Sequence, residues 1–137
     1  MSALIVCSSN IKDRDVLLEA LKKVGVPSDA VVVSKDELLQ MSDRRLRKVD
    51  VLVKKVLFRG YRDVGFKKND RDVYDILMDE DDEVKLRRLF KLEVPFKEKL
   101  QQWYAAIKTK KTLRRKGYAV STEDEGTSIR IHARATA

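Results

Sequence analysis

The sequence predicts an α+β fold, a two-layer sandwich in which helices cover one face of an antiparallel-rich sheet. Two observations lead to this class. Short β-branched runs bounded by turn-forming residues predict strands, and longer segments repeat apolar residues at helical spacing. The 137 residues amount to one ordinary domain. We therefore expect a single α+β domain over residues 1–137 with the order β-α-β, β-meander, α, β-hairpin.

The first third of the chain predicts a strand, a helix and a second strand. The strands are Ala3–Cys7 and Ala30–Val33, both short and rich in β-branched residues. Between them, Asn10 or Asp13 is placed to cap a helix, and Gly25 is placed to end it. The apolar face of this helix is expected to carry Leu17, Leu18, Leu21 and Val24.

The middle of the chain predicts a β-meander. Its expected strands are Val49–Phe58, Tyr61–Phe66 and Asp72–Met78, the last two joined by a polar turn at Lys67–Arg71. Before them, Lys35–Lys48 is polar and rich in arginine, and we interpret it as a short helical turn or a loop. In the first strand the alternation of side chains predicts one face that carries Val49, Val51 and Val53.

The last third predicts two helices and a hairpin. The acidic run Asp79–Glu83 leads into the first helix, and the second begins at Pro95 and stops at Gly117. The closing hairpin pairs Tyr118–Val120 with Ser128–Ala133. The residues expected in the core are Leu17, Leu21, Val51, Val53, Phe66, Tyr74, Phe96, Leu100, Tyr104 and Ile131.

The residue types on which most enzymes depend are scarce. There is one histidine, His132, expected on the polar face of the last strand, and one cysteine, Cys7, expected as a buried structural thiol. The five glycines are scattered, so no phosphate-binding loop can be built. We therefore expect no catalytic residues, no metal, no cofactor and no enzyme activity. The apolar runs are also too short for a membrane span, so no membrane partner is expected.

The charge favours acidic partners, with nucleic acid first among them. The chain carries 30 Lys and Arg against 22 Asp and Glu, a net charge of +8. One basic run consists of Arg44, Arg45, Arg47 and Lys48. The alternative interpretation is that such runs are solvated faces that keep the protein soluble. The same alternative applies to the acidic run Asp79–Glu83, which also suits the dipole at the start of a helix.

The second helix gives the sharpest prediction. Its apolar stripe, expected to include Trp103 and Tyr104, occupies an arc that continues into Lys110, Lys111 and Arg114. Either the last turns run past the core, or the long side chains lie along apolar surface with their charges outside. The alternative to a phosphate-facing patch is simple stabilisation of the helix end. The expected nucleic-acid-binding residues are Lys108, Lys110, Lys111, Arg114, Arg115 and Lys116, together with Arg44, Arg45 and Arg47.

Three segments carry a resemblance to a known family. Phe96–Tyr118 (FKEKLQQWYAAIKTKKTLRRKGY), Gly60–Leu77 and Glu123–Ala133 resemble motifs of the "hypothetical chloroplast reading frame thirty-five" family, a domain of unknown function from plastids, cyanobacteria, other bacteria and bacteriophages. Lys35–Lys48 has no counterpart in those motifs. The resemblance transfers no catalytic residues.

The same resemblance implies a second function. Family members are encoded near an AAA+ ATPase and a ferredoxin-like protein, which implies an adaptor or assembly subunit with a protein partner such as that ATPase. The acidic run Asp79–Glu83 and the basic run Arg44–Lys48 would then steer the association. The expected location is the cytoplasm, or the plastid stroma or host-cell cytoplasm for a plastid or phage gene.

Overall fold

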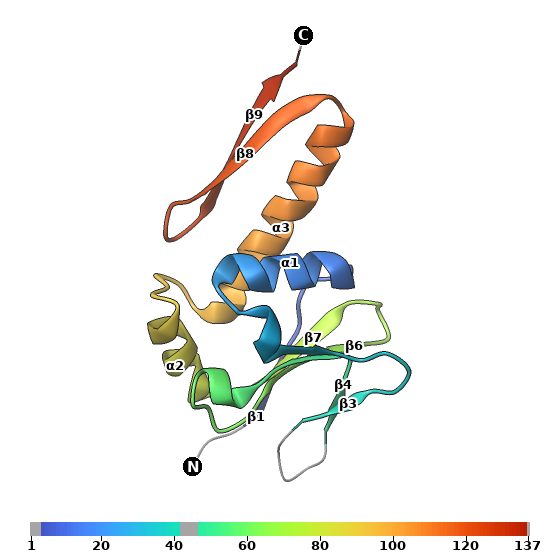
Figure 1. Ribbon diagram of the computed structural model, residues 1–137, viewed down its shortest axis with the longest axis vertical. Helices are drawn as coiled ribbons and strands as arrows, with labels where there is room; N and C mark the ends of the chain where they lie inside the picture. The colour runs from blue at the N-terminus through green and yellow to red at the C-terminus, as the bar shows by residue number, and fades with distance from the viewer. Residues whose placement is uncertain (1–3, 42–46, 137) are drawn as a thin grey trace.

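A computed structural model describes residues 4–41 and 47–136, and it confirms the predicted α+β class. Its main sheet is antiparallel, with the strand order β1-β7-β6-β5-β2, and in Figure 1 helices α1 and α3 lie above it while α2 lies to its left. The strands of this sheet are β1 (Leu4–Cys7), β2 (Val31–Val33), β5 (Val51–Val53), β6 (Val64–Lys68) and β7 (Tyr74–Asp79). The helices are α1 (Arg14–Val24), α2 (Asp82–Leu89) and α3 (Phe96–Arg115).

The main core lies between the sheet and helices α1 and α3. Nine of the ten predicted core residues are buried there, and Ile131 is half-buried against them. Helix α1 begins where the sequence predicted, because the carboxylate of Asp13 accepts hydrogen bonds from the amides of Asp15 and Val16. It ends at Gly25, whose φ of 126° is a conformation that other residues rarely adopt.

The structure on the opposite face of the sheet differs from two predictions. The described parts of Lys35–Lys48 contain no helix; instead β3 (Leu39–Gln40) pairs with β4 (Lys48–Val49) as a small hairpin. A second core lies here, in which Met41, Val49, Leu52 and Leu77 are buried together. Val49 therefore does not share a face with Val51 and Val53, because the chain bends at Asp50 between β4 and β5.

Two predicted strands are shorter in the structure. The prediction for Val49–Phe58 extends too far, since β5 ends at Val53 and Lys55–Leu57 forms a 3₁₀ turn. The prediction for Tyr61–Phe66 begins too early, because β6 starts at Val64. The residues between these strands form a loop whose backbone amides need acceptors from outside the sheet.

The acidic run provides some of those acceptors, so only part of it, including the exposed Glu80 and Asp81, is the solvated face considered from the sequence. Asp79 and Asp82 are completely buried. The Asp82 carboxylate accepts hydrogen bonds from the amides of Tyr61 and Arg62, and Asp79 accepts one from Arg62 Nε at 3.2 Å. Glu83 accepts a 2.7 Å bond from the amide of Phe96 at the start of α3. The run does lead into a helix, as predicted.

The last hairpin is longer than predicted and forms its own two-stranded sheet. Its strands β8 (Tyr118–Asp124) and β9 (Ile129–Ala135) pack against α3 and not in the main sheet (Figure 1). Lys99 of α3 is buried, and its ammonium donates to Asp124 Oδ1 at 2.9 Å and to the carbonyl of Gly126 at 2.7 Å. Lys99 therefore fixes the tip of the hairpin to the helix.

Candidate functional site

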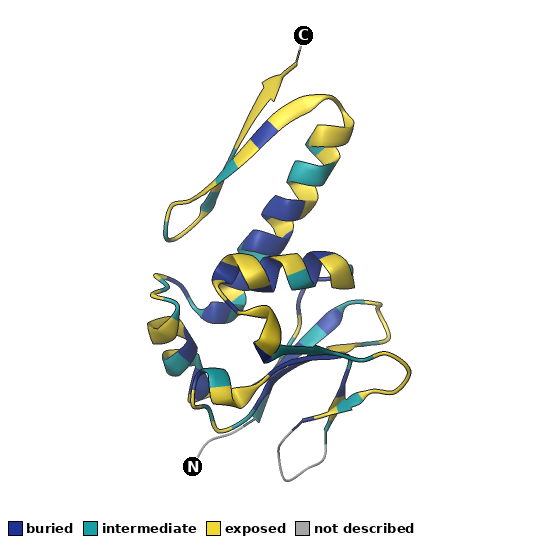
Figure 2. Cartoon of the chain, viewed as in Figure 1, coloured by how far each residue is buried: buried dark blue, intermediate teal, exposed yellow. Residues whose placement is uncertain are grey.

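The basic end of α3 extends beyond the core. Phe96, Leu100, Trp103, Tyr104 and Ile107 are buried, as the stripe predicted, but no residue of the helix after Ile107 is buried. Figure 2 shows this change from dark blue to yellow and teal as α3 rises away from the sheet. The last turns of α3 therefore run past the core, as the first of the two predicted arrangements had it, although Lys110, Lys111 and Leu113 remain half-buried.

Lys110 lies among other cations. Its side chain is half-buried, and desolvation together with the charges of Arg114 and of Lys23 on α1 lowers its pKa, against an opposing effect of Glu19. Among the described residues, no acidic side chain forms an ion pair with Lys23, Lys110 or Arg114. Three positive charges therefore share one surface without a paired counter-charge. A bound anion would relieve their mutual repulsion.

Lys111 belongs to the same run but has a partner. Its ammonium lies 2.8 Å from Glu19 Oε1, and this hydrogen bond raises the pKa of Lys111. The bridge joins α3 to α1, so part of the charge of Lys111 is used within the protein. By contrast, Lys108, Arg115 and Lys116 are exposed and form no ion pair within the described part of the chain.

The described part of the first predicted basic run does not lie close to the second run in space. Arg44 and Arg45 lie outside the described residues. Arg47 is half-buried just before β4, and Figure 1 places β4 at the opposite end of the molecule from the end of α3. The candidate site therefore consists of the helix end without Arg47.

The sequence prediction missed the contribution of α1. Lys23 lies 5.4 Å above the Trp103 ring and within electrostatic reach of Lys110. Its position could not be read from spacing alone, because it depends on how α1 packs across α3. Arg134 of β9 is a further exposed cation on the hairpin that follows the helix.

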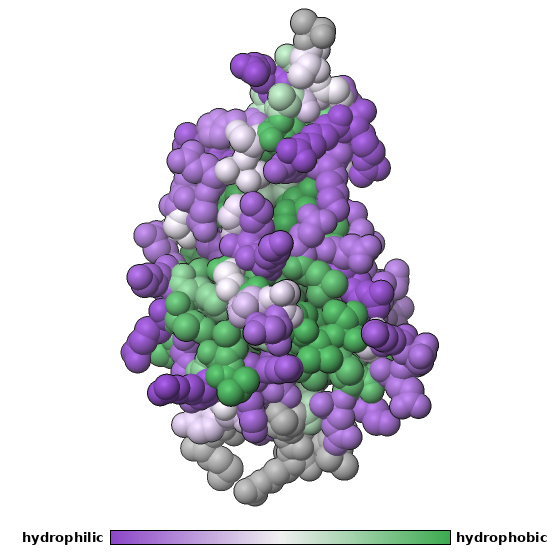
Figure 3. All heavy atoms as spheres, viewed as in Figure 1, coloured by the Kyte–Doolittle hydropathy of each residue, from purple (hydrophilic) through white to green (hydrophobic). Residues whose placement is uncertain are grey.

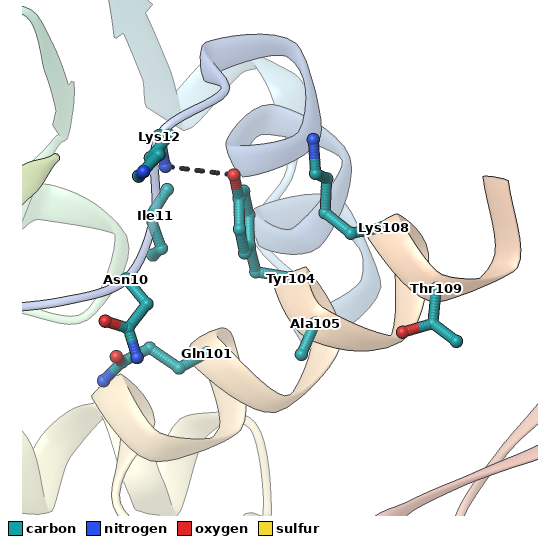
Figure 4. A pocket seen from close by; sticks show the side chains of 8 residues that line it. All are labelled: Asn10, Ile11, Lys12, Gln101, Tyr104, Ala105, Lys108 and Thr109. Atoms are coloured by element: carbon teal, nitrogen blue, oxygen red, sulfur yellow. Dashed lines mark hydrogen bonds between the residues drawn. The ribbon is translucent and has the colours of Figure 1, made fainter. Parts of the chain in front are cut away.

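A groove runs beside the candidate site, between α3 and the loop that precedes α1 (Figure 4). Its volume is about 400 Å³, and Tyr104 and Lys108 line it. The Tyr104 hydroxyl accepts hydrogen bonds from the amides of Lys12 at 3.0 Å and Asp13 at 2.9 Å. These bonds hold the start of α1 against α3, so Tyr104 has a structural role there.

The described residues contain no arrangement typical of a metal or catalytic centre. No group of three His, Cys, Asp or Glu side chains in this part of the chain could hold a metal ion. Cys7 is half-buried and accepts a 3.4 Å contact from Lys97 Nζ. His132 is exposed, with Nε2 3.6 Å from Glu123. None of the described helices has the length and apolar character of a membrane span.

A family model described as a protein of unknown function (DUF1257) matches residues 21–131. This range includes α3, most of the hairpin and only the last turn of α1. No curated protein and no solved structure matches the chain.

Proposed function

The chain belongs to the DUF1257 family of proteins of unknown function, and we propose from its own surface that it binds the phosphate backbone of RNA or DNA. The observation that carries the proposal is the group of Lys23, Lys110 and Arg114, none of which forms an ion pair with a carboxylate among the described residues. Lys108, Arg115 and Lys116 extend this positive surface along the exposed end of α3.

The dimensions of the helix end suit several phosphates. Lys108 and Arg115 are separated by seven residues of helix, about 10 Å along the axis. Duplex DNA carries one phosphate per 3.4 Å along each strand, so more than one phosphate lies opposite this surface. Each neutralised phosphate releases a counterion, which makes binding dependent on salt.

We expect little sequence readout. Trp103 and Tyr104 are the aromatic side chains of α3 nearest its basic end, and both are buried in the core. Neither can stack on an unpaired base, which is the usual source of a preference for single strands. Binding through cations to phosphates carries no sequence information by itself.

The test is a titration of labelled duplex DNA and single-stranded RNA between 50 and 200 mM salt. Lys110→Glu combined with Arg114→Glu is compared with the wild type and with a control that combines Lys67→Glu and Arg71→Glu. All four residues are cations without an ion pair among the described side chains, so the two variants change the net charge equally. We expect the first variant to reduce the log–log salt slope on DNA by about 2 and the control to preserve it.

Two results would contradict the proposal. One is a wild-type protein that shows no salt-dependent binding in this range. The other is an equal loss of affinity in both double variants, because that would show an effect of net charge without a defined site.

The proposal includes three further statements. The protein is a binding protein and not an enzyme, which metal analysis of the purified protein and screening for hydrolase and nuclease activity would test. It is a relative of the "hypothetical chloroplast reading frame thirty-five" family, as the motif in Phe96–Tyr118 suggests. It acts in the cytoplasm, in a plastid stroma or in a host cell.

A further inference from the structure

The main sheet has a free edge beside an apolar groove. β2 is the last strand of the sheet, and among the described residues no other strand pairs with its outer side. The groove lies between this strand and α1 and has a volume of about 360 Å³. It is lined mainly by the half-buried Leu18, Val31 and Val33, and Figure 3 shows apolar side chains exposed at the level of β2.

The backbone of this edge is arranged for another strand. The Lys54 amide donates to the Ala30 carbonyl at 2.8 Å, and the Ser34 amide donates to the Asp50 carbonyl at 2.8 Å. These bonds show that the backbone amides and carbonyls of the even-numbered residues of the edge point toward β5. Backbone groups alternate along an antiparallel strand, so the carbonyls of Val31 and Val33 and the amide of Val33 point outward.

The side chains of the edge support the same conclusion. Val31 and Val33 pack toward α1 and the main core, so they form the floor of the groove, and Leu18 of α1 forms its wall. An added strand would place alternate side chains against these residues. Main-chain hydrogen bonds would supply affinity and the groove would select the side chains, as in other cases of strand addition.

The charges around the groove indicate what it binds. Its charged lining residues are Glu19 and Lys22. Glu19 is held by Lys111 at 2.8 Å, whereas Lys22 forms no ion pair among the described residues. Lys22 is therefore the lining charge that is available to a ligand, and it favours a carboxylate.

A second copy of this chain is a poor occupant. Each copy carries a net charge of +8, so two copies repel each other. β2 has three residues, and pairing over that length buries far less than the roughly 1,600 Å² of a standard interface. A short extended segment matches the three residues of this strand.

We propose that the β2 edge and its groove bind an extended peptide segment of a partner protein, with aliphatic side chains at alternate positions and a carboxylate beside Lys22. This site is separate from the phosphate-binding surface proposed above. It is the kind of docking surface that the adaptor function considered from the sequence would need.

The probe is a labelled peptide, Glu-Ile-Thr-Ile-Glu, followed by fluorescence anisotropy and by the backbone amide signals of the protein. Two control peptides have the same length: Lys-Ile-Thr-Ile-Lys, and the acidic peptide with N-methylated isoleucines. We expect the acidic peptide to bind about fivefold more tightly than the basic one. N-methylation should weaken binding at least tenfold, and the shifted amides should lie at Val31–Ser34.

A charge reversal provides the decisive variant. Lys22→Glu should reverse the preference, so that the basic peptide binds more tightly than the acidic one. Arg71→Glu, an equal charge change at an exposed turn, should leave the preference as in the wild type. Both substituted side chains are exposed, so neither change disturbs the core.

The proposal is overturned by any of three results. These are no binding of the acidic peptide at millimolar concentration, binding that N-methylation does not affect, and a peptide preference that Lys22→Glu does not change. Since the probe contains no phosphate, failure here leaves the RNA and DNA titration unaffected.

Discussion

Lys99 offers the strongest test of how the hairpin is held on α3. Its side chain is 2% exposed, and its ammonium bonds to Asp124 and to the Gly126 carbonyl. Lys99→Met retains most of the buried stem and removes the charge. A hydrogen bond to a charged group contributes about 1.5–3 kcal/mol, but Asp124 is 42% exposed and can regain water. Burying the ammonium also costs free energy. We therefore expect a net loss of about 1–3 kcal/mol.

Lys99→Ala separates the stem from the charge. Compared with Lys99→Met it lacks a buried methylene, a sulfur and a methyl group, and at about 0.8 kcal/mol for each it should cost about 2–3 kcal/mol more. Urea unfolding gives both free energies of unfolding, and hydrogen exchange shows where protection is lost. The loss should be concentrated in β8 and β9. Equal stabilities of Lys99→Met and the wild type, or unchanged exchange in the hairpin, would show that Lys99 does not hold it.

The same pair gives a pH dependence with a defined sign. Burial alone would raise the pKa of Asp124, but hydrogen bonds from Lys99 and from the Gly126 amide outweigh it and lower the pKa below its usual 3.8. Asp124 therefore contributes stability that is fully present above pH 3.8 and is lost as the pH falls through the lower pKa of the folded state. Lys99→Met should remove most of this acid-induced loss.

Three further predictions concern the cores and the helix starts. Gly65→Ala should cost about 1–3 kcal/mol by urea unfolding, because the added Cβ would lie 2.7 Å from Met41 Sδ in the second core. Tyr104→Phe should cost about 1–2 kcal/mol, because it leaves two backbone amides before α1 without their acceptor. Burial raises the pKa of Glu83 despite the bond from the Phe96 amide, so its contribution to stability falls as the pH rises from 4.5 through the pKa of the folded state. Glu83→Gln should flatten that fall in unfolding curves measured at a series of pH values.

The elements that the sequence predicted well are those whose signals are local. The cap of α1, its glycine stop and the apolar stripe of α3 depend on residues within one or two turns, and the structure confirms them. Lys35–Lys48 carries no such periodicity. Its short strands are held by Met41 and Val49, which pack over Gly65, and that contact joins residues far apart in the sequence.

Charged residues were the least predictable from the sequence. Asp79 and Asp82 belong to a run of five acids, which is typical of a solvated surface, yet both are buried. Asp82 accepts from the loop amides of Tyr61 and Arg62, and Asp79 accepts from the Arg62 side chain and from the Asp81 amide. Lys99 lies among polar residues and is nevertheless buried. At the candidate site, the run of cations was visible in the sequence. Its division into paired Lys111 and unpaired Lys110 depended on the position of Glu19 across the helix interface.

Glu19 links the two proposed surfaces. It lines the groove beside β2 and also holds Lys111 at the end of α3. On α1, Lys22 faces the groove, and the next residue, Lys23, lies within electrostatic reach of Lys110. The peptide site and the phosphate site therefore lie in the same electrostatic field. At physiological salt this field is screened over a Debye length of about 8 Å. A carboxylate held beside Lys22 adds negative charge close to the phosphate-binding cations and lowers their attraction for a nucleic acid. The two ligands are therefore expected to compete through charge without touching, so an acidic partner in the groove would weaken binding of RNA or DNA at the helix end.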